Sequence, residues 1–235
     1  MSLVFVIQAS MTSHPLDNPI WSALRSVHAR LAVTDGTVAR YPAAVAPFVS
    51  VSDEEADVAG RLERLVETGE HLYFVGCVPK LGKGWSVEMH APLPQMVCRA
   101  PVQVKDGPEI RELTDAHVPD MLALTALVFP GFFRARTIDM GRYIGIYHGS
   151  RLAAMAGERM RMDGYTEISA VCTHPDQVGR GYAQRLVAMV SNAAFARGST
   201  PFLHVYRHNT RAMAVYERLG FYVRTDVALC SVTRQ

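Results

Sequence analysis

Two glycines in the second half of the chain stand where backbone amides could bind a phosphate. Residues 171–183 read Val-Cys-Thr-His-Pro-Asp-Gln-Val-Gly-Arg-Gly-Tyr-Ala, so a strand pattern runs into a loop and a helix pattern begins directly after Gly181. The free N–H groups of such a loop and the positive end of the helix converge on one point and bind an anion. Glycine also leaves the approach of a pyrophosphate unobstructed. The alternative is that Gly179 and Gly181 only tighten a turn between a strand and a helix.

The context of this turn excludes two other nucleotide-binding loops. The chain contains no G-x-x-x-x-G-K-[ST] segment, so a Walker-type loop is absent. The G-x-G lacks a third glycine at the Rossmann spacing, and it follows three antiparallel-looking strand patterns instead of opening a series of βαβ units.

A second segment, residues 208–221, places a capping residue, a small residue and a phenol on one expected helix. Asn209 can cap this helix, Ala212 allows close packing, and Tyr216 follows four residues later. Gly220 then ends the helix before a strand pattern. Each residue also has a plain structural interpretation, and for Tyr216 this is packing in the core.

Together, the two segments resemble the GNAT superfamily of N-acetyltransferases. The family signature Q/R-x-x-G-x-G/A aligns with residues 178–183, and N-x-x-A-x-x-x-Y-x-x-x-G-F matches residues 209–221. The first match departs from the pattern, because Val178 stands where glutamine or arginine is expected and Gln177 lies one place early. Since backbone amides are the main phosphate ligands in this family, cofactor binding is expected to survive the change.

The resemblance covers residues 105–235 and implies acetyl-CoA as co-substrate, with no metal. Three strand patterns precede the glycine-rich turn, and the third of them ends at Thr173. In this family the pantetheine arm lies in a gap beside that third strand, where a backbone N–H polarises the thioester carbonyl. The implied cofactor-binding residues are Val171, Cys172, Thr173, Val178, Gly179, Arg180, Gly181, Tyr182, Ala183, Asn209 and Ala212.

Two catalytic residues are implied in the same way. Tyr216 matches the family's usual proton donor to the leaving thiolate, and Glu167 matches the general base of some histone-modifying relatives. Glu158 on the preceding strand is a rival base, and a plain surface-strand role for Glu167 stays open. Cys172 could suggest an acyl-cysteine intermediate, but no motif places a histidine beside it. It is therefore interpreted as a small buried residue.

The acceptor implied by the resemblance is the primary amine of a small molecule, which attacks the thioester directly in a ternary complex. The aromatic cluster of residues 129–133, followed by Arg134 and Arg136, suggests an apolar floor with a cationic rim, unless these aromatics only form core. Such a pocket suits an amine that carries a carboxylate. Two alternatives stay open: transfer to protein N-termini or lysines, and a non-catalytic acyl-CoA-binding sensor.

The elements that position these residues form a mixed α/β domain over residues 105–235. Strands are expected at 110–113, 143–147, 152–159, 167–173, 202–206, 221–224 and 227–232, and helices at 114–128, 182–197 and 210–219. Two prolines and a glycine between residues 98 and 108 favour extended or turn backbone, which places a domain boundary at 104/105.

Residues 1–104 are expected to form an additional α/β domain of unknown role. A helix is expected over residues 18–31, and the capping box at residues 52–55 predicts another helix that ends at Gly69. The helix-then-strand pattern permits a degenerate copy of the same fold, packed against the second sheet. No glycine-rich turn in this half supports a second cofactor.

The composition is that of an ordinary globular protein, with no sign of nucleic-acid or metal binding. The 235 residues are 49% hydrophobic and 20% charged, and the net charge of +2 gives no electrostatic footprint for nucleic acid. Four scattered cysteines and nine scattered histidines fit free thiols and no metal site. Residues 1–8 have no basic segment, and their apolar run is too short for a signal peptide or a membrane span. We therefore expect a cytoplasmic protein without membrane contact, and a homodimer stays open.

Overall fold

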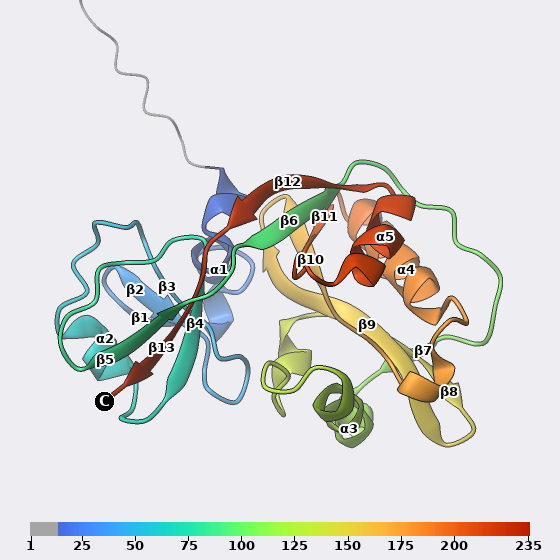
Figure 1. Cartoon of the computed structure of the whole chain (residues 1–235), viewed down its shortest axis with the longest axis horizontal. Coiled ribbons are helices and arrows are strands. Elements are labelled where there is room, and N and C mark those ends of the chain that lie inside the picture. Colours follow the sequence, from blue (N-terminus) through green and yellow to red (C-terminus); the bar gives the residue numbers. More distant parts are fainter. Residues whose placement is uncertain (1–13) are drawn as a thin grey trace, which may run out of the picture.

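The computed structural model describes residues 14–235, so the apolar run at residues 1–8 lies outside the described residues. The chain forms two lobes with α1 between them (Figure 1). The first half contains η1 (Pro15–Asp17), α1 (Pro19–Leu24), η2 (Ala29–Leu31), β1 (Val33–Asp35), β2 (Val38–Arg40), β3 (Val49–Val51), α2 (Arg61–Leu65), β4 (His71–Val75), β5 (Trp85–Met89) and β6 (Leu93–Cys98). The second half contains β7 (Arg111–Leu113), η3 (Asp115–His117), α3 (Val118–Val128), η4 (Thr137–Met140), β8 (Tyr143–His148), β9 (Arg151–Met162), β10 (Tyr165–Thr173), η5 (Pro175–Gln177), α4 (Tyr182–Ala196), β11 (Thr200–His204), α5 (Thr210–Arg218), β12 (Phe221–Val227) and β13 (Leu229–Arg234).

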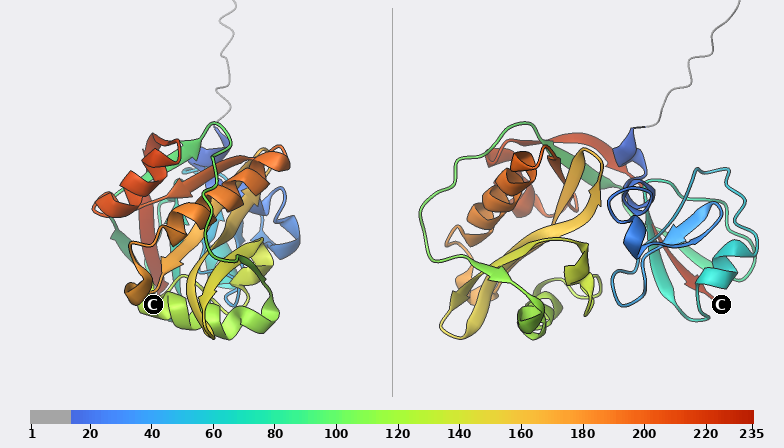
Figure 2. Two further views of the ribbon diagram at one scale, coloured as in Figure 1. Left: turned by 90° about the vertical axis from the view of Figure 1, so that its right-hand side faces the viewer. Right: turned by 180° about the vertical axis from the view of Figure 1, so that it is seen from behind.

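The larger sheet forms the second lobe. Its seven strands lie in the order β12-β6-β11-β10-β9-β8-β7. Strands β10 and β11 pair in parallel, and the other neighbouring pairs are antiparallel. Helices α4 and α5 lie on one side of this sheet and α3 on the other (Figures 1 and 2). The mixed α/β sheet predicted from the sequence is confirmed.

The smaller lobe carries two three-stranded sheets, β1-β2-β3 and β4-β13-β5, which a parallel bridge between Phe48 and Tyr73 connects. The helix expected over residues 18–31 is split into α1 and η2. The capping box at residues 52–55 does not open a helix, because α2 begins only after Gly60. The reason is local: the Asp53 carboxylate accepts hydrogen bonds from its neighbours, which form a turn among themselves.

Each half contributes its last strand to the sheet of the other half. Strand β6 lies between β11 and β12, where Val97 is opposite Phe202 and Cys98 is opposite Phe221. Strand β13 lies between β4 and β5 in the smaller lobe. The expected boundary at 104/105 falls in the connection between β6 and β7. The two halves of the sequence on either side of this boundary therefore exchange one strand each, β6 and β13.

With the exchanged strands included, both lobes follow the same strand order. In the second lobe, β8, β9, β10, β11, the exchanged strand β6 and β12 are neighbours in this order, and α4 connects β10 to β11. In the first lobe, β1, β2, β3, β4, the exchanged strand β13 and β5 follow one another in the same way, and α2 connects β3 to β4. In each lobe a parallel contact joins the strand regions that flank the helix. This is the arrangement expected of a reduced copy of one fold.

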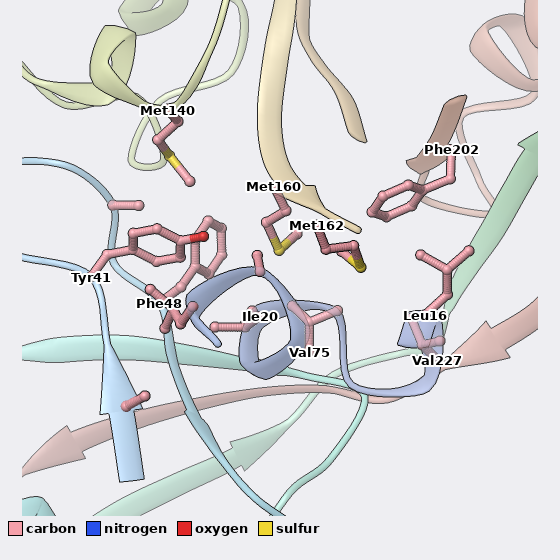
Figure 3. Packing of buried hydrophobic residues seen from close by; sticks show 14 of the residues in the cluster. Leu16, Ile20, Tyr41, Phe48, Val75, Met140, Met160, Met162, Phe202 and Val227 are labelled. Atoms are coloured by element: carbon pink, nitrogen blue, oxygen red, sulfur yellow. The ribbon is translucent and has the colours of Figure 1, made fainter. Parts of the chain in front are cut away.

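A shared hydrophobic core joins the lobes. Figure 3 shows Ile20 of α1 near Met160 of β9, in a cluster built from both halves. His28 crosses the same interface, with one ring nitrogen 2.8 Å from the Tyr41 hydroxyl and the other 2.8 Å from the Met140 carbonyl oxygen. Burial lowers the pKa of His28 to about 4, so the imidazole is neutral at neutral pH.

Candidate active site

Strand β10 separates from β11 beyond its first residues, and a bulge interrupts its pairing with β9. Its pairing with β11 covers residues 165–167, although both strands continue further. On the other side, the register with β9 shifts between Ser169 and Cys172, and Ala170 has a positive φ of 51°. This bulge takes Ala170 and Val171 out of the ladder with β9. A gap therefore opens beside the residues expected to pair with pantetheine.

The glycine-rich turn reaches α4 through left-handed backbone. Gly179 and Gly181 have φ values of 89° and 78°, and Gly181 is the N-cap of α4. A Cβ at either position would meet no atom of the described residues within 4 Å, so the backbone conformation, and not crowding, requires glycine. Helix α4 is 15 residues long and has no acidic residue in its first turn. Its positive end is available to an anion.

Positively charged side chains surround this turn in a cationic recess of about 320 Å³, which the turn, the start of α4 and residues 103–108 enclose. Its charged lining residues are Arg180, Arg185 and Lys105 with one carboxylate, Asp106, and Arg185 Nε donates to the Lys105 carbonyl oxygen at 3.0 Å. Figure 2 shows the segment between β6 and β7 passing along α4. Arginine and lysine beside a helix N-terminus suit a phosphate group.

Helix α5 brings a phenol to the gap beside β10. Asn209 caps this helix as predicted, with its side-chain oxygen accepting from the Ala212 N–H at 3.1 Å. Tyr216 and Cys172 are both buried and line one cavity. Burial raises the pKa of each side chain to about 12, so both are protonated at neutral pH. The phenol can therefore donate a proton, whereas the Cys172 thiol is a poor nucleophile.

That space, the central cavity, measures about 240 Å³ and lies between the lobes. Besides β10, β11 and α5, its walls are Phe48, Val75, Leu93 and Leu229 from the first lobe and its exchanged strands, and Thr125, Val128, Phe129, Phe132, Phe133, Thr137, Tyr143 and Arg159 from the second lobe. Leu93 and Leu229 are the first residues of the exchanged strands, so the exchange itself shapes the cavity. The aromatic cluster of residues 129–133 lies in the wall, but Arg134 and Arg136 do not line it.

The cation in the wall, Arg159, is paired with a carboxylate beneath it. Its Nε and Nη2 donate to the two oxygens of Glu167 at 2.7 Å each, and His204 Nδ1 lies 2.8 Å from Glu167 Oε1. Burial alone would raise the pKa of Glu167, but the charge and hydrogen bonds of Arg159 and the bond from His204 lower it to about 2. Glu167 is 0% exposed and does not line the cavity. This placement does not favour the expected role of general base.

The second partner of His204 defines its tautomer. Gln95 accepts from Arg224 Nε through Oε1 at 2.6 Å and donates to the Leu16 carbonyl oxygen through Nε2 at 2.8 Å, so its amide orientation is determined. The same Nε2 lies 3.0 Å from His204 Nε2, which must therefore accept. His204 then carries its proton on Nδ1 and donates it to Glu167. Neither ring nitrogen is free to take a proton from a substrate.

The rival base, Glu158, is also engaged. It is buried, bonded to Arg197, and lies 3.7 Å from Arg161 Nε. It does not line the central cavity.

The structure separates the expected site residues into three groups. Val171, Cys172, Asn209 and Tyr216 line the central cavity; Gly179, Arg180, Gly181 and Tyr182 line the cationic recess; Thr173, Val178, Ala183, Ala212 and Glu167 line neither. The departure at Val178 leaves an exposed side chain, whereas Gln177 is buried. Sequence reasoning missed Phe48, Tyr143, Arg159 and His204, because no local motif marks them.

A splayed strand pair, a glycine-capped helix and a buried phenol at one cavity are the features expected of a GNAT-type acyltransferase. A family model described as FR47-like protein matches residues 143–229. A crystal structure from Novosphingobium aromaticivorans, assigned as an acetyltransferase of the GNAT family, is 35% identical to this chain. The match covers 94% of this chain and 99% of that one, with a TM-score of 0.83. The chain therefore belongs to the GNAT family of acetyltransferases.

More distant structures share the fold. A GCN5-related N-acetyltransferase from Kribbella flavida is 16% identical and covers 91% of each chain at a TM-score of 0.60. A GCN5-related N-acetyltransferase-like protein from Streptococcus suis is 16% identical and covers 92% of each chain at a TM-score of 0.52. No curated protein matches the sequence.

Two further properties concern residues 14–235. In this part of the chain, no helix combines the length and apolar character needed to cross a bilayer. Within the same residues, no three His, Cys, Asp or Glu side chains are grouped as ligands for a metal ion.

Proposed function

We propose that this protein transfers an acetyl group from acetyl-CoA to the primary amine of a small molecule. The observation that carries this proposal is the convergence on one cavity of the β10 bulge, the Tyr216 phenol and walls from both lobes. The cavity lies between the lobes, and Phe48, Val75 and Leu93 of the first half and Leu229 of β13 form part of its wall. Such an enclosed space fits a small acceptor better than an open groove for a protein segment.

Acetyl-CoA would bind along a path from the cationic recess to the central cavity. We expect the pyrophosphate at the N–H groups of residues 179–183, with Arg180 and Arg185 beside it. The pantetheine arm then follows the gap between β10 and β11 past Val171 and Cys172. This places the thioester near the bulge, where a backbone N–H can donate to the developing oxyanion.

The reaction needs no covalent enzyme intermediate. The neutral amine nitrogen attacks the thioester carbon, a C–N bond forms, and the C–S bond then breaks. The amine loses one proton to water, because Glu167, Glu158 and His204 are all engaged elsewhere. Tyr216 donates a proton to the leaving thiolate, which departs as free coenzyme A, and the phenolate regains a proton from solvent. The products are an N-acetylated amine and coenzyme A.

Isothermal titration with acetyl-CoA tests the cofactor site. In the Gly181→Glu variant, we expect binding to weaken at least about 100-fold, since a carboxylate would face the pyrophosphate. Gly60→Glu is the matched control, because Gly60 is the N-cap of α2 with a comparable φ of 68°. It should bind as the unaltered protein does. If acetyl-CoA does not bind the unaltered protein, or binds both variants equally, the proposal fails.

A further inference from the structure

The hydroxyl of Tyr143 is a buried polar group without a partner. The residue is 1% exposed and lines the central cavity, and no atom of the described residues hydrogen-bonds its oxygen. A buried hydroxyl in this state forfeits the hydrogen bonds that water would supply. Burial raises the pKa of Tyr143 well above its usual range, so the group stays a neutral phenol. An unpaired phenol in a cavity wall indicates that a ligand completes the pairing.

Glycine 157 directs this phenol towards the β10 bulge. Tyr143 on β8 is opposite Gly157 on β9, and Gly157 is opposite Ser169 on β10. A Cβ at Gly157 would lie 2.1 Å from the Tyr143 ring, so the ring lies across the space that a side chain would fill. The ring therefore extends over β9 towards the strand that carries the bulge, and it packs in one cluster with Cys172.

The rest of the cavity offers rings and almost no available charge. Phe48, Phe129, Phe132, Phe133 and Tyr206 all line it. No aspartate or glutamate of the described residues lines it, and its one arginine, Arg159, is neutralised by Glu167. A second ammonium group on an acceptor would find no carboxylate there. A carboxylate on an acceptor would find only a cation that is already paired, and burying a charge without a partner is costly.

We propose that the acceptor is an aromatic monoamine without a second charged group, and that Tyr143 positions its amino group. This inference rests on the proposed function and names the substrate class of that site. The aromatic walls hold the apolar body, and the Tyr143 oxygen accepts one N–H of the neutral amine. The nitrogen lone pair is then directed to the thioester beside the bulge. Tyr143 is a positioning residue, and the proton balance of the transfer is unchanged.

A panel of amines tests the substrate class with the full-length protein and acetyl-CoA. 2-Phenylethylamine and phenylalanine differ only by a carboxylate, and spermidine adds further ammonium groups to an aliphatic chain. We expect kcat/KM for 2-phenylethylamine to exceed that of the other two by at least about 100-fold, because each of those buries an unpaired charge. Equal or better turnover of phenylalanine or spermidine overturns the inference. So does efficient transfer of a hexanoyl group to small polar amines, since the cavity would then hold the acyl chain.

Two matched variants test the role of Tyr143. Tyr143→Phe removes only the hydroxyl, and we expect kcat for 2-phenylethylamine to fall about tenfold with the KM for acetyl-CoA unchanged. The thermal midpoint should stay the same or rise, because an unpaired buried hydroxyl is removed. Tyr147→Phe is the control, since Tyr147 lies on the same strand, outside the cavity, with its hydroxyl 2.7 Å from Asp120. An unchanged kcat in Tyr143→Phe overturns the assignment.

Failure of this inference can be told apart from failure of the proposed function. If acetyl-CoA binds but 2-phenylethylamine gives neither turnover nor binding heat with the coenzyme A complex, only the inference is overturned. If acetyl-CoA itself does not bind, the proposed function fails and the inference fails with it.

Discussion

The two lobes share a strand order but differ in the elements that could do chemistry. The second lobe enters the 15-residue α4 through Gly179 and Gly181, whereas the first enters the five-residue α2 through Gly60. Before its final strand, the second lobe carries α5 with Tyr216, and the first has residues 76–84 without a helix. The first lobe instead contributes Phe48 and other apolar residues to the cavity. The same strand order can therefore carry the elements of a cofactor site in one lobe and contribute only part of the cavity wall in the other.

The largest expected effect comes from cutting the chain at the apparent boundary. Residues 105–235 expressed alone lack β6, which separates β11 from β12, and leave β13 without β4 and β5. We expect this fragment to show no cooperative thermal transition by circular dichroism, whereas the full chain unfolds in one transition. A fragment that melts cooperatively and binds acetyl-CoA would contradict the shared-strand account.

A second comparison uses one ion pair from each lobe. Arg159–Glu167 has its carboxylate side chain 1% exposed, and Arg40–Glu70 has its carboxylate 19% exposed. We expect Glu167→Gln to lower the free energy of unfolding by about 3–5 kcal/mol in urea titrations at pH 7, because it leaves Arg159 buried without its partner. Glu70→Gln should cost less, about 1.5–3 kcal/mol, because the buried Arg40 guanidinium keeps its hydrogen bonds to the carbonyl oxygens of Tyr41 and Leu65.

The pH dependence of that effect has a defined sign. Glu167 has a folded-state pKa of about 2, below its ordinary 4.5. Its stabilisation is therefore present above pH 4.5 and is lost as the pH falls through 2. As the pH falls from 4.5 towards 2, the difference in free energy of unfolding between the unaltered protein and Glu167→Gln should therefore decrease. A loss of kcat without a loss of stability would instead restore Glu167 as a general base.

The smallest expected effect on stability comes from a contrast between two buried tyrosines. Tyr216→Phe removes the proposed acid, and we expect kcat to fall about 100-fold with the affinity for acetyl-CoA unchanged. Tyr41→Phe, in the first lobe, removes a hydrogen bond to His28 and should cost about 1 kcal/mol of stability with kcat unchanged. Similar kcat values for both variants would exclude Tyr216 as the proton donor.

The parts of the site that could be predicted are those built from neighbouring residues. Gly179 and Gly181 were recognisable because a left-handed turn before a helix needs glycine at those places. Asn209 was recognisable as a cap because its partner, the Ala212 N–H, is three residues away. The capping box at residues 52–55 misled because the same side chains can satisfy a turn without a helix.

The sequence by itself determined the order of elements in the second half, the glycine-capped entry to α4 and the helix that carries Tyr216. These depend on backbone preferences and hydrogen bonds over a few residues. Only the tertiary structure decided the exchange of β6 and β13, the pairing of Glu167 with Arg159 and the unpaired phenol of Tyr143. Such features depend on which strands meet across much of the chain, and burial then decides which polar groups find partners.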